Sequence, residues 1–131
     1  KRYGHPLSLI LLDIDNFKQV NDNYGHIVGD SVLKNVAAAV SKSIRDTDIF
    51  ARWGGDEFAI LLPNTNVRQA RRMAERIRKC INSSSFDNLE DITCSFGVAA
   101  YEENDTKQSL LRKVDDLLLR AKTSGKNIVI S

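Results

Sequence analysis

The chain has 131 residues, of which 42% are hydrophobic, and a formal net charge of +2. This size and composition predict one globular domain with its own core, and the near-neutral charge argues against a nucleic-acid-binding surface. No apolar stretch approaches the roughly 20 residues of a membrane-spanning helix, and Asp13 and Asp15 interrupt the apolar N-terminal stretch, so neither membrane contact nor a signal peptide is expected. Cys80 and Cys94 form no C-x-x-C pair, which is typical of free core thiols in a reducing, cytoplasmic compartment.

The first elements can be read from apolar periodicity. Residues 7–14 (LSLILLDI) are an unbroken apolar run of strand length, which predicts a central strand covered on both faces. A short helix is expected to follow and to end near residues 23–26. The apolar residues over 32–44 repeat at helical spacing and predict a second helix, with Gly29-Asp30-Ser31 as its capping sequence.

Two apolar stretches, residues 48–53 and 57–63, flank a pair of glycines and predict a β-hairpin. Gly54 and Gly55 suit a tight two-residue turn that needs positive φ. Residues 82–91 have the composition of a loop. The remaining predicted elements are a helix over 67–81, a strand over 92–101, a helix over 110–121 and a short strand over 127–131.

The predicted order is β-α-α-β-β-α-β-α-β, without repeats, so residues 1–131 are expected to form a single domain. A central hairpin combined with crossover helices indicates an α/β (α+β) fold. Its centre would be a mixed, mostly antiparallel five-stranded sheet flanked by helices.

Two acids lie at the end of the first predicted strand. Asp13 is costly to ionise there unless a positive group meets it, with a purely structural role as the alternative, and Asp15 follows two residues later. Because alternate residues of a strand share a face, both side chains should point to the same side. For Asp15 an alternative is a cap on the helix that follows.

A second acidic pair, Asp56 and Glu57, lies at the predicted hairpin tip. If the hairpin lies beside the first strand, its tip approaches Asp13, and three or four carboxylates converge. Hard oxygen ligands of this kind favour Mg²⁺ or Mn²⁺, and paired ions about 3.5–4 Å apart serve phosphoryl and nucleotidyl transfer. The alternative is that both acids are solvated at an exposed turn.

No G-x-x-x-x-G-K-[ST] loop is present, because Asn127 follows Gly125-Lys126. A bound nucleotide would therefore have its phosphates met by metal, backbone amides and lysines. The candidate lysines are Lys18, near the acidic strand end, and Lys122 and Lys126, one helical turn apart near the end of the last helix. Each is alternatively a solvated surface lysine.

The stretch RWGGDEF (52–58) closely resembles the signature of the GGDEF family of bacterial diguanylate cyclases, which make cyclic di-GMP from two GTP. The resemblance extends along the chain through residues 11–33 (LLDIDNFKQVNDNYGHIVGDSVL), 95–99 (SFGVA) and 120–127 (RAKTSGKN). It implies a fold similar to the nucleotidyl cyclase core of class III adenylyl cyclases and to the polymerase palm.

The resemblance also implies a metal and catalytic centre. Asp13, the Ile14 carbonyl and Asp56 match metal ligands of the family, with two Mg²⁺ (or Mn²⁺) ions expected per active half-site. Glu57 matches an acid that contacts metal or deprotonates the attacking hydroxyl. Lys18 matches a position that contacts phosphate or stabilises developing charge.

The resemblance assigns the substrate as GTP. Asn21 and Asp30 match the residues that read guanine, which suits an amide and a carboxylate facing its N–H edge; for Asp30, a helix cap is the alternative. Lys122 and Lys126 match phosphate contacts. Gly54 and Gly55 let the turn approach the nucleotide closely.

An inhibitory site is implied as well. Arg45 and Asp48 match the family's R-x-x-D motif, at which cyclic di-GMP binds and represses activity, and Arg76 matches a further contact of that site. A forked guanidinium suits guanine or phosphate. The alternative for Arg45 and Asp48 is a salt bridge at a helix end.

Some features depart from the family pattern. The D-x-L-T-x-L-x-N-R motif that usually precedes the first strand is missing, which suggests a fragment of a longer signalling protein with an upstream sensory domain. Leu119 replaces a frequent tyrosine, and Lys126 replaces a frequent arginine, with loss of bidentate phosphate binding.

The resemblance therefore predicts a diguanylate cyclase that condenses two GTP into cyclic di-GMP and two pyrophosphates, acts as a homodimer and is inhibited by its product. The main alternative is a catalytically silent GGDEF domain that binds GTP or cyclic di-GMP as a regulator. Two further alternatives are a variant that makes mixed purine dinucleotides and a dimerisation module without a ligand. Asp30, as a guanine-type acceptor, favours GTP.

Overall fold

A computed structural model describes residues 5–84, 89 and 92–131. Its centre is a five-stranded sheet with the strand order β2-β3-β1-β4-β5. The strands are β1 (Leu7–Ile14), β2 (Ile49–Arg52), β3 (Glu57–Pro63), β4 (Cys94–Ala100) and β5 (Val129–Ile130). Among the strand pairs of the described residues only β4–β5 is parallel, so the mixed, mostly antiparallel sheet predicted from the sequence is confirmed.

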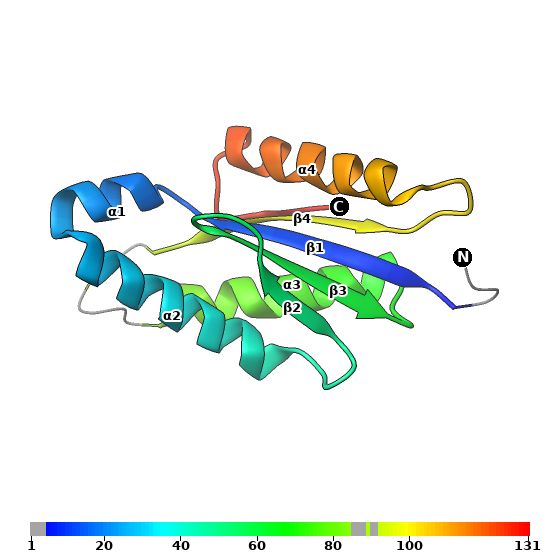
Figure 1. Ribbon diagram of the computed structural model, residues 1–131, viewed down its shortest axis with the longest axis horizontal. Coiled ribbons are helices and arrows are strands. Elements are labelled where there is room, and N and C mark those ends of the chain that lie inside the picture. The colour runs from blue at the N-terminus through cyan, green and yellow to red at the C-terminus, as the bar shows by residue number, and fades with distance from the viewer. Residues whose placement is uncertain (1–4, 85–88, 90–91) are drawn as a thin grey trace.

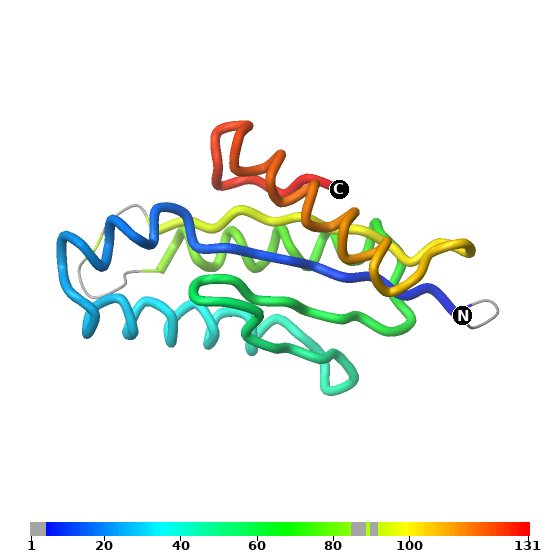
Figure 2. The backbone as a smooth tube through the Cα atoms, turned by 45° about the horizontal axis from the view of Figure 1, so that its top comes forward, coloured from blue at the N-terminus to red at the C-terminus, as the bar shows by residue number. Residues whose placement is uncertain are grey.

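Helices cover the sheet on both faces (Figure 1). They are α1 (Phe17–Tyr24), α2 (His26–Ser43), α3 (Val67–Asn82) and α4 (Lys107–Thr123). Helices α2 and α3 lie on one face and α4 on the other, while α1 extends from one end of the sheet, as the rotated view also shows (Figure 2). Most of the predicted loop at residues 82–91 lies outside the described residues.

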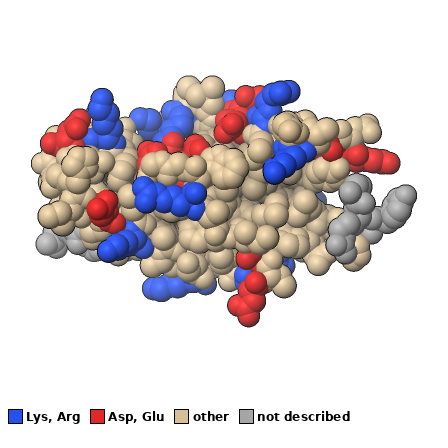
Figure 3. All heavy atoms as spheres, viewed as in Figure 1, with Lys and Arg blue, Asp and Glu red and all other residues tan. Residues whose placement is uncertain are grey.

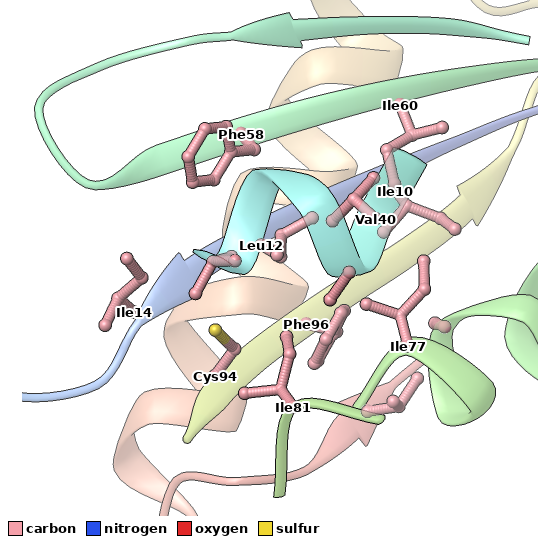
Figure 4. Close-up of a cluster of buried hydrophobic side chains, with 14 of the residues drawn as sticks. Ile10, Leu12, Ile14, Val40, Phe58, Ile60, Ile77, Ile81, Cys94 and Phe96 are labelled. Carbon is pink, nitrogen blue, oxygen red and sulfur yellow. The ribbon is translucent and has the colours of Figure 1, made fainter. Parts of the chain in front are cut away.

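The central position of β1 explains its unbroken apolar sequence. Ile10, Leu12 and Ile14 pack into the large core beneath α2 and α3 (Figure 4). Leu9 and Leu11 point the other way, into a smaller core with α4. Both faces of β1 are thus removed from water, which is the condition under which a strand loses its polar alternation.

Helix α2 begins earlier than predicted, at His26, and Asp30 is therefore not its cap. Gly25, with φ +90°, separates α1 from α2. Gly29 lies inside α2, and a Cβ added there would overlap Oδ1 of Asn21. The glycine that resembles a helix start in the sequence instead provides room for a side chain of α1.

The turn between β2 and β3 also differs from the prediction. Neither Gly54 nor Gly55 has a positive φ, and the backbone N–H groups of Trp53 and Gly54 both donate to the carbonyl of Glu57. Residues 53–56 form the loop, and the guanidinium of Arg52 donates to the carbonyls of both glycines. The predicted two-residue turn with positive φ is therefore wrong, because the longer loop needs no left-handed residue.

A glycine sets the distance between α4 and β4. A Cβ at Gly97 would lie 2.6 Å from both the amide nitrogen of Leu118 and the carbonyl oxygen of Val114. Because these are backbone atoms of a helix, they cannot give way without moving α4. The C-terminal half of α4 is thus held directly against the sheet.

We expect Gly97→Ala to lower the free energy of unfolding by about 1–3 kcal/mol, the usual cost of overpacking a close-packed core. Urea denaturation measures this change. Gly55→Ala is the matched control, because a Cβ there has nothing within 4 Å. An equal loss in the two variants would contradict this account of Gly97.

Candidate functional site

The predicted acids meet at one end of the sheet. In the antiparallel register Asp13 of β1 lies opposite Glu57 of β3, and on its other side opposite Ser95 of β4. Residues directly opposite each other share a face, and this is the face that α4 covers. The β2–β3 turn and the C-terminal end of α4 lie at this same end (Figure 1).

Asp13 has an incompletely satisfied carboxylate. Its Oδ1 is buried and receives no hydrogen bond from a donor among the described residues. Burial, a hydrogen-bonding contact with the Asp56 carboxyl and the charges of Asp56 and Glu57 raise the pKa of Asp13 to about 7, against the opposing effect of Lys122. Two facing carboxyl groups can form a hydrogen bond only by sharing a proton. When that proton is lost at higher pH, the pair carries two negative charges and attracts a cation.

Glu57 has a perturbed carboxyl as well. Burial, followed by the charges of Asp115 and Asp56, raises its pKa, and Lys122 again acts in the opposite direction. Asp115 lies on α4 and was not predicted, since an exposed acid on an amphipathic helix has no distinguishing sequence pattern. The site thus contains acids from β1, the turn, β3 and α4.

These residues fit a divalent cation, although no group of three or more His, Cys, Asp or Glu side chains in the described ranges is already gathered closely enough to hold one. Asp13 offers an oxygen without a donor, and Asp56 faces it. The Ile14 carbonyl is close by and accepts a weak contact of 3.5 Å from Lys122 Nζ. Carboxylate and carbonyl oxygens are the ligands that Mg²⁺ and Mn²⁺ prefer.

Lys122 is the positive group that the acidic strand end requires. Its Nζ lies 2.9 Å from Asp15 Oδ1 and 3.5 Å from Asp13 Oδ2. Burial alone would lower the pKa of this ammonium group, but the hydrogen bond to Asp15 and the charge of Asp13 raise it. Lys122 is therefore a persistent cation beside the two aspartates.

Asp15 points to the same side as Asp13, as predicted from the alternation of side chains along a strand, but it does not cap α1. The N-cap is Asn16, whose side chain makes no capping hydrogen bond. The carboxylate of Asp15 instead accepts hydrogen bonds from residues far away in the sequence. The capping alternative is thus wrong.

The other two predicted lysines differ in placement. Lys126 lies beyond the end of α4, in a turn where its φ is +63°, and its Nζ donates to Asn16 Oδ1 at 2.7 Å. The expected spacing of one helical turn from Lys122 is therefore wrong. Lys18 is exposed on the first turn of α1.

The two residues expected to read guanine come from adjacent helices. The Asn21 side chain of α1 lies over Gly29 of α2, and the exposed Asp30 follows that glycine. The fold therefore places Asn21 and Asp30 near each other, close to the junction of α1 and α2.

The R-x-x-D residues form the salt bridge that was the alternative to an inhibitory site. The Asp48 side chain is fully buried and accepts a hydrogen bond of 2.7 Å from an Arg45 Nη and another of 2.8 Å from the Arg45 backbone N–H. The same guanidinium donates to Thr65. Arg76 of α3 donates to the carbonyl of Ser43, two residues before Arg45. Arg45 and Arg76 are thus brought to the same region.

An apolar hollow of about 610 Å³ lies away from the acids, between α4 and the β2–β3 hairpin. Trp53, Leu61 and Leu110 contribute to its walls, and Ile49 at its rim is 58% exposed. It offers few polar groups for chemistry, so we place the functional site at the acidic strand end.

Residues 1–128 match the family described as "Diguanylate cyclase, GGDEF domain". The chain belongs to the GGDEF family. This GGDEF domain is 41% identical over 129 residues to diguanylate cyclase DgcP of Pseudomonas aeruginosa, covering 96% of the chain and 19% of that protein. It is 44% identical over 124 residues to diguanylate cyclase DgcM of Escherichia coli, covering 95% of the chain and 30% of that protein. The chain thus spans less than a third of either relative.

Solved GGDEF domains have the same fold. The active GGEEF domain of a Vibrio cholerae diguanylate cyclase superposes with a TM-score of 0.90 at 38% identity, covering 95% of this chain and 81% of that one. The GGDEF domain of Caulobacter crescentus DgcB, in complex with c-di-GMP, gives 0.90 at 31% identity, covering 97% of this chain and 78% of that one.

The surface is mixed in charge and mostly uncharged on the face in Figure 3, where basic and acidic side chains lie side by side. This agrees with the net charge of +2. Among the described residues, no helix combines the length and hydropathy required to cross a bilayer.

Proposed function

We propose that this GGDEF domain synthesises cyclic di-GMP from two GTP molecules with release of two pyrophosphates. The observation that carries the proposal is the carboxyl group of Asp13. Its buried Oδ1 has no donor among the described residues, and the group contacts the Asp56 carboxyl of the GGDEF turn. When both are ionised, the two carboxylates repel each other unless a cation lies between them, and a divalent cation is what nucleotidyl transfer uses. The relatives named diguanylate cyclase, DgcP at 41% identity and DgcM at 44% identity, support the same reaction.

In the proposed mechanism each domain holds one GTP. Asn21 and Asp30 bind the guanine edge, and Lys122 and Lys126 bind phosphate oxygens. Asp13, Asp56 and the Ile14 carbonyl would hold Mg²⁺ or Mn²⁺, which polarises the α-phosphate when bound. Lys18, which is exposed at the start of α1, is assigned a contact to phosphate.

Glu57 is suited to act as the general base that accepts the proton of the attacking 3′-hydroxyl. Because its pKa is raised, it is a stronger base than an ordinary carboxylate and accepts the proton of the attacking 3′-hydroxyl more readily. The 3′-oxygen then bonds to the α-phosphorus of the other GTP, and the bond to pyrophosphate breaks. The second domain repeats the step in the opposite direction.

The product has two-fold symmetry, so the catalytic unit is proposed to be a homodimer with two half-sites facing each other. Gly54 and Gly55 have a specific role in this arrangement. Neither has a positive φ, and a Cβ at Gly55 would have no atom of the described residues within 4 Å. Their glycine identity is best explained by close approach of the nucleotide to the turn.

The proposal is tested by incubating the purified domain, and a version fused to a dimerising coiled coil, with GTP and Mg²⁺ and separating the products by chromatography. We expect cyclic di-GMP and pyrophosphate in a 1:2 ratio. Bound cyclic di-GMP without pyrophosphate release from the fused dimer would support the regulatory alternative and overturn the enzyme.

We also propose that cyclic di-GMP represses activity at Arg45, Asp48 and Arg76. Arg45→Ala should therefore retain turnover but lose inhibition when initial rates are measured with increasing cyclic di-GMP. The variant should also unfold about 1–3 kcal/mol more easily, because Asp48 keeps a buried carboxylate with fewer partners. Arg112→Ala, an exposed arginine of α4, is the control, and an Arg45→Ala enzyme as inhibitable as the parent would refute the assignment.

A further inference from the structure

Asp15 is the most completely hydrogen-bonded carboxylate at the site, and the mechanism above assigns it no task. Its side chain is 1% exposed. Oδ1 accepts hydrogen bonds from Ser95 Oγ at 2.6 Å and from Lys122 Nζ at 2.9 Å. Oδ2 accepts hydrogen bonds from Thr93 Oγ1 at 2.7 Å and from the Asn127 backbone N–H at 3.0 Å. One carboxylate thus joins the end of β1 to β4, α4 and the turn before β5.

Two of these partners belong to the segment that carries the phosphate-binding lysines. Lys122 is in the last turn of α4, and Asn127 directly follows Lys126. Lys126 and Asn127 have φ values of +63° and +50°, a left-handed conformation that residues with a Cβ rarely adopt. Such a turn persists only where surrounding contacts hold it, and the Asn127 N–H is held by Asp15 and by Ser95 Oγ.

Asp13 and Asp15 differ in how their carboxylate oxygens are hydrogen-bonded. Asp13 has an oxygen without a donor and faces other acids, as a metal ligand should. Asp15, by contrast, accepts hydrogen bonds on both carboxylate oxygens from four other residues. Its carboxylate is therefore fixed by donors rather than open to a metal.

We propose that Asp15 is a positioning residue that holds the Lys122 ammonium and the Lys126–Asn127 turn in the geometry that receives the triphosphate of GTP. This inference rests on the proposed function for the identity of the ligand. Asp15 acts through Lys122 and the turn rather than by touching the substrate.

The direct test is Asp15→Asn, which keeps the shape of the side chain but removes its charge and half of its acceptors. In ¹H–¹⁵N spectra of the ligand-free domain, we expect the Lys122 ammonium signal and the Asn127 amide signal to shift and the Asn127 amide to exchange faster with solvent. Unchanged signals would overturn the proposal. This readout needs no catalysis, so a parent enzyme that makes no cyclic di-GMP would refute the proposed function alone.

The functional readout is kcat and KM for GTP. Asp15→Asn should lower kcat/KM by about 10- to 100-fold, the loss known for removal of a hydrogen-bonding partner of a metal ligand, which we apply here to the partner of a phosphate-binding lysine. Thr93→Val is the matched control, since it removes one hydrogen bond to the same carboxylate and leaves Lys122 and Asn127 in contact with it. If both variants lose stability equally and activity equally, Asp15 has only a structural role.

A double-mutant cycle decides whether Asp15→Asn lowers activity through Lys122. In a Lys122→Met background, Asp15→Asn should cause a much smaller further loss than in the parent, because contacting residues that act as a unit are not additive. Full additivity would contradict the proposal. If Asp15→Asn does not fold, Asp15→Glu takes its place in all three measurements, since it keeps the charge but displaces it by one methylene.

Discussion

Asp56→Asn is expected to reduce cyclic di-GMP formation by at least about 100-fold, because removal of even an outer-shell partner of a metal costs 10- to 100-fold. Folding should be spared. The asparagine has the same shape, and its neutral amide relieves the repulsion that Asp56 exerts on Asp13. Pyrophosphate release measures the rate, and urea denaturation measures the free energy of unfolding.

The control for Asp56→Asn is Asp116→Asn, which removes an exposed acid from α4 and should leave both quantities unchanged. An Asp56→Asn enzyme with near-parent turnover would show that Asp56 is merely a solvated turn residue, the alternative considered from the sequence.

The second large effect concerns pH. In the metal-free domain, stability should fall as pH rises from about 4 to about 7. The unfolded chain loses the Asp13 proton near pH 3.8, whereas the folded chain keeps it until about pH 7. Within this window the folded state binds more protons, so each increase in pH favours unfolding, by up to about 1.4 kcal/mol per pH unit for one such group. The raised pKa of Glu57 acts in the same direction.

Urea denaturation in EDTA at several pH values between 5 and 8 checks this expectation. Asp13→Asn should flatten the decline and make the metal-free domain more stable than the parent at pH 8. Added Mg²⁺ should stabilise the parent at that pH, because it binds the ionised carboxylates. A metal-free parent that becomes more stable between pH 5 and 7, with no difference from Asp13→Asn, would contradict the pKa assigned to Asp13.

Much of the fold follows from periodicity in the sequence. The unbroken apolar run of β1 predicted a strand covered on both faces, and the two apolar stretches that flank Gly54 and Gly55 predicted the β2–β3 hairpin. If the hairpin pairs with β1, its tip and Asp13 lie at the same end of the sheet, so their contact could be expected from these elements. The GGDEF signature supplied the expected chemistry.

Other features depend on contacts between residues far apart in the chain. Asp15 meets Thr93 and Ser95, whose hydroxyls are 78 and 80 positions away and follow no pattern. Gly29 resembled a helix boundary, although its function is to make room for Asn21. A single sequence records that a residue is small or polar, but not which distant group it meets.

The pairing of β1 with β3 has a consequence for how the site is assembled. Glu57 and Phe58 are neighbours, yet one lies opposite Asp13 on the α4 face and the other, 3% exposed, belongs to the large core. Sliding β3 by a single residue would send the phenylalanine toward the acids and the glutamate into the core. The burial that selects the native register of β3 therefore also selects the arrangement of the carboxylates. We expect that a misaligned form of this domain, with its acids out of place, would also lose core burial and so would not persist during folding.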